Sequence, residues 1–475
     1  MEQLGGLDNL FLQAESDRTP MHVTAVLVYN PPTSSAGQFD FDAVYRHFEN
    51  CLTKSRIFRR KLLNAPFGAD KPYWIEDEDF DLGQHVVHDE LAAPGTTRDF
   101  WKRVSELHGI ALDRSRPLWS ANVVSGLDNV EDLAPGSFAI VLKVHHAAID
   151  GVSASEIIGA MHSLRPDDTS NDAADDWQPE KAPGKMGLMW RSYLNSFTRP
   201  TELMQSVSKL MPAIRKASKK SVGGLALRQK FKTRFNQRVS AERVTNALRI
   251  DLDQIRKLRK CVDGATVNDV VVSIVGGGLR RYLAAKDELP EESMVAGAPI
   301  NTRDSADSAS TGNAVSMMRI PLRTDIADPV ARLAAVHTGS QSSKRFAKTA
   351  GVHSMSDIAD SLSPGWLALG IRALTAEKVS DRVPTPLHTV VSNVPGPPVD
   401  LFLRGARLRL VLGLGPLIDQ VGLFHAVTSV GGSMAITFTS CASMLPDPEF
   451  YRQCLLDAFE SLCTAAASAA QGDSD

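Results

Sequence analysis

The sequence has no apolar run long enough to cross a lipid bilayer. A membrane-spanning helix needs about 20 mostly apolar residues in succession, and charged or polar side chains interrupt every apolar stretch of this chain before that length. The first residues also lack the basic region and apolar core of a secretory signal, because Asp8 and Glu15 fall among them. These absences predict a cytoplasmic protein without a spanning segment.

Cysteine is scarce and scattered, with 5 in 475 residues. The five stand at Cys51, Cys261, Cys441, Cys454 and Cys463. No pair has the CxxC spacing of a metal or redox site, and no local setting marks one of them as a nucleophile. We therefore expect reduced thiols, no metal ion and no permanently bound cofactor. We also expect no nucleic-acid partner.

Mixed strand and helix patterns occupy both ends of the chain and are separated by a segment of different composition. The length suggests more than one domain. We predict an α/β protein with a first domain over 1–165, a connector over 166–240 and a second domain over 241–475. The connector opens acidic and polar, and residues 181–238 then carry fourteen Lys or Arg against one acid, Glu202.

Local patterns predict several individual elements. β-branched and apolar runs indicate strands, and longer periodic runs indicate helices. The expected strands cover 21–29, 138–146, 244–252, 387–394 and 433–440, and the expected helices cover 153–164 and 266–283, the last capped by Thr266.

The most informative stretch runs from Val144 to Gly151 and reads VHHAAIDG. It follows an apolar strand and precedes a helix for which Ser153 and Glu156 would form a capping box. Side chains alternate along a strand. We therefore expect His146 on the apolar, inward face of the strand and His145 on the opposite face, together with a lysine.

A histidine at such a strand end can take a proton from an alcohol and return it near neutral pH. This makes His146 the candidate catalytic base. The alternative is a core histidine that only bonds a backbone carbonyl. Asp150 either orients an imidazole or holds the tight turn, and Gly151 gives that turn its backbone freedom.

The HHxxxDG pattern resembles the signature of the CoA-dependent acyltransferases, which include chloramphenicol acetyltransferase, plant acyltransferases and condensation domains of peptide synthetases. Further blocks resemble the bacterial wax ester synthase/diacylglycerol acyltransferase family, in the same order along nearly the whole chain. They are LDNLFLQAESDRTPMHV at the N-terminus, LDRSRPLW at 112–119, ATVNDVVVSIVGGGLRRYL at 265–283 and VSNVPGPPVDLFLRGARL at 391–408.

This resemblance implies two chloramphenicol-acetyltransferase-like domains side by side, with an active-site tunnel at their interface. It implies direct transfer of a long-chain acyl group from acyl-CoA, the co-substrate, to diacylglycerol or a fatty alcohol. The product would be triacylglycerol or a wax ester, and His146 matches the family's base. The alternatives are a different alcohol or amine acceptor, and a catalytically weak lipid-binding relative.

The matching blocks supply further candidate site residues. Asn268 would either donate a hydrogen bond to the reacting carbonyl or its oxyanion, or serve only at the helix N-terminus. Asp269 beside it is expected to be structural. Ser392 and Asn393 would either line the tunnel or only end their strand before a proline–glycine turn.

The chain departs from the family pattern at two positions. Ser120 follows the PLW segment, where the family usually has an acidic residue, and Phe424 stands where the family often has an amide. Both changes leave the candidate base in place. They bear on the preference for the acceptor and on the level of activity.

The basic connector predicts where the protein works. Its cations are interspersed with apolar and aromatic side chains, a mixture typical of segments that lie on an anionic bilayer or lipid droplet. We expect peripheral contact with the inner membrane or with lipid droplets. A solvated connector, and cations that bind the phosphates of CoA, are the alternatives.

Overall fold

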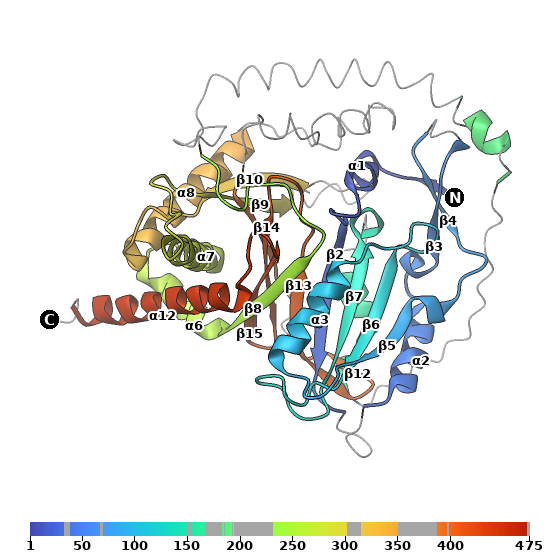
Figure 1. Ribbon diagram of the computed structural model, residues 1–475, viewed down its shortest axis with the longest axis horizontal. Helices are drawn as coiled ribbons and strands as arrows, with labels where there is room; N and C mark the ends of the chain where they lie inside the picture. The colour runs from blue at the N-terminus through green and yellow to red at the C-terminus, as the bar shows by residue number, and fades with distance from the viewer. Residues whose placement is uncertain are drawn as a thin grey trace.

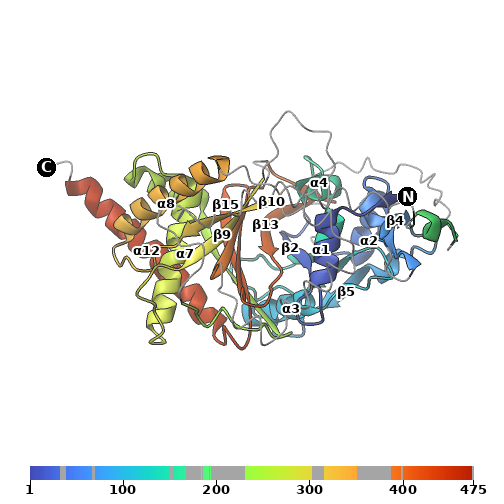
Figure 2. The ribbon, with the colours of Figure 1, turned by 90° about the horizontal axis from the view of Figure 1, so that it is seen from above.

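The residues that the structure describes form two six-stranded sheets and one small three-stranded sheet, with helices packed on them. The computed structural model describes residues 1–32, 39–66, 70–149, 154–166, 183–184, 186–191, 193, 231–301, 315–349, 387–396 and 399–472. The two large sheets, each with its helices, lie side by side along the long axis (Figure 1, Figure 2). We call the part built on the sheet that contains β2 and β7 the first half, and the other part the second half. The predicted α/β class is confirmed.

The bounds of the elements are as follows. The strands of the described residues are β1 (Glu2–Gln3), β2 (His22–Tyr29), β3 (Arg60–Leu63), β4 (Tyr73–Glu76), β5 (Val86–Glu90), β6 (Trp119–Ser125), β7 (Phe138–His145), β8 (Arg243–Asp251), β9 (Val295–Asn301), β10 (Val315–Pro321), β11 (Thr389–Val394), β12 (Phe402–Leu403), β13 (Ala406–Leu414), β14 (Leu423–Val430) and β15 (Ser433–Cys441). The α-helices are α1 (Gly6–Ala14), α2 (Phe41–Cys51), α3 (Thr97–Gly109), α4 (Ala154–Met161), α6 (Leu252–Leu258), α7 (Val267–Ala284), α8 (Pro329–Thr349) and α12 (Pro448–Gly472).

The sheet of the first half has the strand order β12-β13-β2-β7-β6-β5. On one of its faces, Phe48 of α2 and Ile157 of α4 pack on Leu142 and its neighbours. On the other face, Phe100 and Val104 of α3 pack against the remaining strand side chains. A strand covered on both faces must be apolar nearly throughout. This is why all 8 residues of β7 are buried.

The sheet of the second half has the order β10-β9-β11-β14-β15-β8. Strand β11 runs parallel to β9 and β14, and the other neighbours are antiparallel. Helices α7, α8 and α12 pack together on this sheet around one large apolar core. No helix among the described residues is long and apolar enough to span a membrane.

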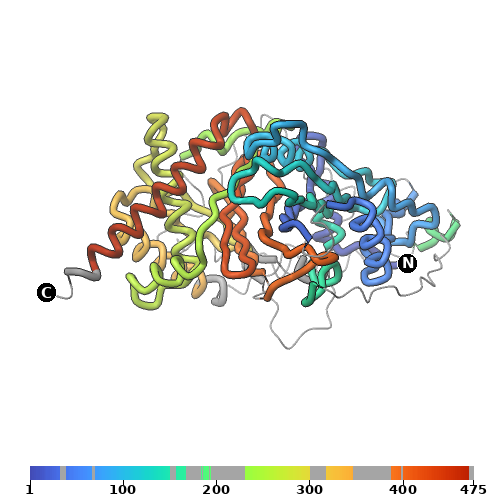
Figure 3. The backbone as a smooth tube through the Cα atoms, turned by 90° about the horizontal axis from the view of Figure 1, so that it is seen from below, coloured from blue at the N-terminus to red at the C-terminus, as the bar shows by residue number. Residues whose placement is uncertain are grey.

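Two late strands cross over to the first half. Strand β13 pairs antiparallel with β2, from Leu414 opposite Thr24 to Leu408 opposite Tyr29. Figure 1 shows orange β13 beside blue β2, and Figure 3 shows the same backbone from below. The expected domain boundaries of 1–165, 166–240 and 241–475 do not describe this crossing, because residues 402–414 complete the sheet of the first half. The boundaries themselves stay a prediction.

Most elements expected from local patterns are present to within two residues. They include the strands β2, β7, β8, β11 and β15 and the long helix α7. The expected cap of α7 is also found, since Thr266 and Asp269 bond each other's backbone amides in a capping box. Helix α4 is shorter than the expected 153–164, and Ser153 of its expected capping box lies outside the described residues.

Helix α7 contains three successive glycines because neighbouring elements approach its backbone. A Cβ atom at Gly276 would lie 2.1 Å from the backbone oxygen of Leu322, and one at Gly278 would lie 2.6 Å from Cδ2 of Leu455. Glycine in a helix costs about 1 kcal/mol relative to alanine. Here the cost is offset by the close packing that the missing side chains allow.

We expect Gly276→Ala to destabilise the protein by more than about 1–3 kcal/mol, the usual cost of overpacking a core, because the obstacle is backbone. Gly159 on α4 is the matched control. No heavy atom lies within 4 Å of a Cβ added there, so Gly159→Ala should stabilise the protein by up to about 1 kcal/mol. Urea unfolding measures both changes. A neutral or stabilising Gly276→Ala would contradict the close approach.

Candidate active site

The two adjacent histidines lie where the chain leaves the first sheet. Strand β7 ends at His145, and a 3₁₀-helical turn over His146–Ile149 follows. The backbone amide of His145 donates to the carbonyl of Leu118 at 2.9 Å, and that of His146 donates to the carbonyl of Met21 at 2.8 Å. The segments that lead into β6 and β2 therefore fix both residues.

The expected contrast between an inward and an outward histidine is not found. The face that carries Lys143 and His145 is as buried as the other, and His145 is 0% exposed. His146 is the more exposed of the two, because it lies in the turn, one residue past the strand. The alternation of side chains does not extend into a 3₁₀ turn.

His146 is held as a neutral imidazole. It stacks on Phe11 of α1, with ring centres 3.9 Å apart and an angle of 23° between the planes. Burial lowers the pKa of His146 to about 4, and the neighbouring His145 adds to the shift. The Nδ1 atom is buried without a hydrogen-bond partner in another described residue. Near pH 7 the ring is therefore unprotonated and can accept a proton.

Glu15, which follows α1, is a site residue that the sequence reasoning missed. Its Oε1 lies 3.5 Å from Nε2 of His145 and accepts a hydrogen bond from the Met21 amide at 3.0 Å. Its Oε2 accepts from Nε of Arg114 at 2.6 Å. Burial alone would raise the pKa of this carboxyl, but His145, the Met21 amide and Arg114 outweigh burial and lower the pKa to about 2. Glu15 is therefore a buried carboxylate.

Ala147 and Glu15 contact the two ring nitrogens of His145. The Ala147 amide donates to Nδ1 of His145 at 3.1 Å, so Nδ1 must be unprotonated. The ring proton then sits on Nε2, which faces the carboxylate of Glu15. His145 therefore has its Nδ1 hydrogen-bonded and its Nε2 3.5 Å from a carboxylate, whereas Nδ1 of His146 has no partner in another described residue.

The loop after α1 also ties this corner to the second half. Arg18 pairs with Asp419 through two contacts of 3.2 and 3.3 Å, and it donates to the carbonyl of Val239 at 2.7 Å. Arg243, the first residue of β8, donates to the backbone oxygen of Arg18. One short loop therefore reaches His145 through Glu15 and the second half through Arg18.

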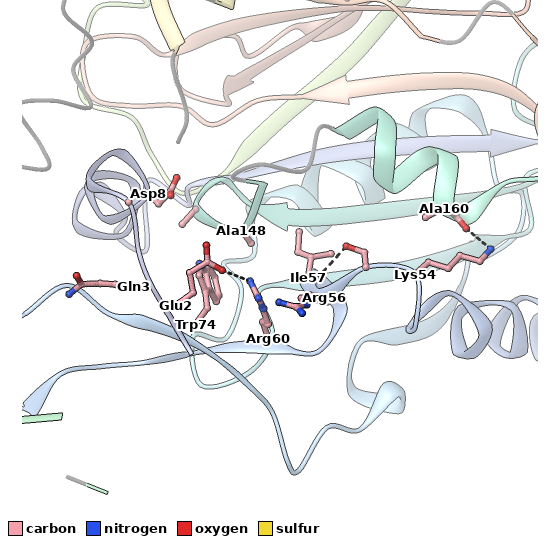
Figure 4. Close-up of a pocket in the computed structure, with 13 residues that line it drawn as sticks. Glu2, Gln3, Asp8, Lys54, Arg56, Ile57, Arg60, Trp74, Ala148 and Ala160 are labelled. Atoms are coloured by element: carbon pink, nitrogen blue, oxygen red, sulfur yellow. Dashed lines mark hydrogen bonds and ion pairs between the residues drawn. The ribbon is translucent and has the colours of Figure 1, made fainter. Parts of the chain in front are cut away.

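A pocket of about 350 Å³ opens beside the turn (Figure 4). Its wall includes Ala147 and Ala148, which directly follow the candidate base. Trp74 and several charged side chains complete it. The charged lining residues are Glu2, Asp8, Lys54, Arg56 and Arg60. A ligand in this pocket would contact the turn that carries His146.

The candidate residues of the later blocks lie in the second half. Asn268 is half-buried in the first turn of α7. Asp269 is buried, completes the cap of the helix and bonds Nδ1 of His337 at 2.9 Å, which supports its expected structural role. Ser392 is half-buried and Asn393 is exposed near the end of β11. No hydrogen bond or ion pair of the described residues joins these four to the histidine corner.

Asp150 and Gly151 lie outside the described residues, as does most of the basic connector, so their roles stay predictions. Among the described residues, no group of three or more His, Cys, Asp or Glu side chains is placed to hold a metal ion.

The two departures from the family pattern occupy packed positions. Ser120 lies opposite Lys143 across the β6–β7 pair. The ring of Phe424 packs against Gly415, where an added Cβ would lie 2.4 Å from the ring carbons, and it contacts the core of the second half. Phe424 is therefore a packing residue in this chain.

Comparison with known proteins agrees with these features. The model of the wax ester synthase/diacylglycerol acyltransferase catalytic domain matches residues 4–271, and the model of the C-terminal domain of the same family matches residues 311–463. The chain belongs to this family. The protein is therefore an acyltransferase, as the sequence motifs predicted.

Relatives match over nearly their whole length. A probable diacylglycerol O-acyltransferase of Mycobacterium tuberculosis is 30% identical over 449 residues, which cover 92% of this chain and 94% of the relative. The solved wax ester synthase/diacylglycerol acyltransferase of Marinobacter aquaeolei VT8 is 25% identical, with a TM-score of 0.71 and coverage of 98% of this chain and 100% of that one.

More distant structures share only the fold. The trichothecene 15-O-acetyltransferase of Fusarium sporotrichioides has a TM-score of 0.58 at 10% identity and covers 97% of this chain and 94% of its own. These matches confirm the predicted architecture of two chloramphenicol-acetyltransferase-like halves side by side.

The lowered pKa of His146 predicts an unusual pH profile for the reaction. With neutral His146 as the base, kcat/KM should stay nearly constant from about pH 8 to about pH 5 and should fall as the pH drops through about 4. An unperturbed histidine would lose half of its activity near a pH of about 6.5. Short assays across this range, with circular dichroism at each pH to verify folding, test the profile. A midpoint near 6.5 would exclude a buried neutral base.

Proposed function

We propose that this acyltransferase moves a long-chain acyl group from acyl-CoA to diacylglycerol or a fatty alcohol, with His146 as the general base. The observation that carries the proposal is a neutral, half-buried histidine in the HHxxxDG corner of a chain of this family. The relatives named above as diacylglycerol O-acyltransferase and wax ester synthase support these two classes of acceptor.

In this mechanism the acceptor hydroxyl gives its proton to His146 while its oxygen attacks the thioester carbonyl. The new C–O bond forms, the C–S bond breaks, and the protonated imidazole returns the proton to the departing thiolate. Transfer is direct, and no acyl-enzyme forms. The neutral state of His146 supports the first step, because a protonated ring could not take up the hydroxyl proton.

The remaining candidate residues take supporting roles in this proposal. Asn268 donates a hydrogen bond to the oxyanion, and Ser392 and Asn393 line a tunnel between the two halves. Asp150 holds the turn after His146, with Gly151 as its flexible residue. The loop of Arg18, which joins the histidine corner to Asp419 of the second half, supports a site at the interface.

We expect His146→Ala to lower turnover by about 100- to 10,000-fold, the usual contribution of a general base, and to leave the protein folded. His145→Ala should reduce turnover less but should lower stability, because it removes a buried partner of Glu15. His88→Ala, which deletes an exposed histidine of β5, is the matched control and should be fully active. Labelled palmitoyl-CoA with a panel of alcohols and diacylglycerol provides the assay.

Two results would contradict the assignment. One is retained activity in His146→Ala. The other is equal loss of turnover in the two adjacent-histidine variants without a difference in stability. Absence of transfer by the wild type to any acceptor of the panel would contradict the function as a whole.

We also propose that the protein meets its water-insoluble substrates at the cytoplasmic surface of the inner membrane or at lipid droplets. Residues 186–191 form a helix in the basic connector, in which Leu188 is buried but Met186, Met189 and Trp190 are exposed. Met186 is 85% exposed and Trp190 is 63% exposed. Exposed apolar and aromatic side chains among cations suit the interface of an anionic bilayer.

Replacing Met186, Met189 and Trp190 together with serine should release the protein from vesicles that contain anionic lipid. Ile110→Ser, which removes an exposed apolar side chain of the first half, is the control and should bind like the wild type. Vesicle flotation measures both, and transfer to a short soluble alcohol should be unchanged in both variants. Unchanged flotation of the triple variant would refute lipid contact through this helix.

A further inference from the structure

A cluster of three arginines lies in the second half, away from the histidine corner. Helices α7, α8 and α12 pack together at the end of the molecule remote from β5 (Figure 1, Figure 2). A pocket of about 870 Å³ opens between them. Three arginines line it: Arg280 and Arg281 come from α7, and Arg332 comes from α8.

None of these three guanidinium groups makes an ion pair with a carboxylate of the described residues. They donate only to neutral oxygen atoms, at 2.6 to 3.4 Å. The acceptors are the carbonyls of Thr324, Ile326 and Ala327 and the hydroxyl of Ser461. Three like charges around one pocket repel one another, and nothing charged among their bonded partners compensates for this repulsion.

Arg332 is the most constrained of the three. It is 4% exposed, and its Nε atom is buried without a hydrogen-bond partner. Burial, together with the charges of Arg281 and Arg280, lowers the pKa of its guanidinium to about 10, although the nearby Asp328 carboxylate acts in the opposite direction. A buried cation without an ion pair among the described residues is unfavourable, and an anion bound in the pocket would stabilise it.

The sequence of α7 makes room for this arrangement. A Cβ atom at position 277 would lie 2.8 Å from an Nη atom of Arg332. Any residue other than glycine at this position would therefore displace the guanidinium. The middle glycine of the run in α7 therefore admits the buried arginine. The cluster is built into the helix packing and is not a chance gathering of surface side chains.

Two acidic residues of α12, Asp457 and Glu460, also line the pocket. One carboxylate oxygen of Asp457 accepts a hydrogen bond from Gln453 at 2.7 Å. With two acids against three arginines, the lining keeps a net positive charge. The lining therefore favours a negatively charged ligand over a positively charged one.

We propose that this pocket binds a phosphate-bearing anion, whose oxygens accept hydrogen bonds from Arg281 and Arg332. The planar guanidinium presents paired donors that match phosphate geometry, and bonds between ionised partners are stronger than neutral ones. The phosphate belongs either to a soluble phosphoester or to the headgroup of an anionic phospholipid. The site is separate from the proposed acyl-transfer centre and does not depend on that function.

Calorimetric titration of the full chain with inorganic phosphate, in a low-salt buffer, tests the site. We expect saturable phosphate binding by the wild type. The affinity of Arg281→Gln for phosphate should be lower by about tenfold or more, the loss typical of one charge-assisted hydrogen bond. Arg332→Lys, which keeps the charge but loses the paired donors, should also bind more weakly. Arg256→Gln, which removes an exposed arginine of α6, is the matched control and should bind like the wild type.

A thermal melt separates this role from a purely structural one. If the arginines form an anion site, Arg281→Gln relieves repulsion between like charges. In the absence of phosphate, this variant should then melt no lower than the wild type. Addition of phosphate should raise the melting temperature of the wild type but not that of the variant. If Arg281 only holds α7 to α12, its removal should lower the melting temperature equally with and without phosphate. The second result would overturn the proposal.

Flotation identifies the source of the phosphate. The vesicles contain phosphatidylcholine and phosphatidic acid. A lipid headgroup is indicated if these vesicles bind the wild type more than Arg281→Gln and if excess inorganic phosphate abolishes the difference. Phosphate binding without such a difference in flotation indicates a soluble phosphoester. If neither inorganic phosphate nor phosphatidic acid distinguishes Arg281→Gln from the wild type, the pocket does not bind phosphate.

Discussion

The pairing of β13 with β2 is the contact on which the arrangement of the two halves depends. Strand β13 belongs to the first sheet, yet the next strand along the chain, β14, belongs to the second, and β13 packs on both β14 and β15. The apolar cluster at this contact takes Val26 and Val28 from β2 and the small side chains Ala247 and Ala435 from the second sheet. Small residues allow the two sheets to approach closely.

The histidine corner is a consequence of the same arrangement. Strand β2 lies between β13 and β7, and its first residue, His22, is directly opposite His145. The corner is therefore held by strands on one side and by α1 on the other. Burial then acts in two opposite ways. It keeps His146 neutral, whereas three donors around Glu15 keep that residue charged in spite of burial. The neutral imidazole of His146 thus adjoins His145, the residue that contacts the carboxylate of Glu15.

Features set by neighbouring residues were predictable from the sequence, and features set by distant ones were not. The strand at 138–146 and the capped helix at 266–283 follow from local periodicity and from Thr266. The pairing of β13 with β2 could not be inferred, because no local pattern near residues 406–414 indicates which strand they pair with. The contrast between the two histidines failed because β7 is covered on both faces and the chain turns at His146. Glu15 was missed because its side-chain partners, His145 and Arg114, lie about 100 or more residues away in the sequence. The only signal for it in the sequence was its position within the N-terminal block that resembles the family.

The crossing also sets an order of events during synthesis. Until residues 406–414 leave the ribosome, β2 is an edge strand with one row of unpaired backbone groups, and such edges readily pair with other chains. Strand β13 begins roughly 380 residues after β2 ends. At roughly 5–20 residues per second this interval lasts about 20 to 80 seconds. The first half of the protein therefore cannot complete its sheet as it is made, and the histidine corner gains its final strand neighbours only after residue 414 has been synthesised.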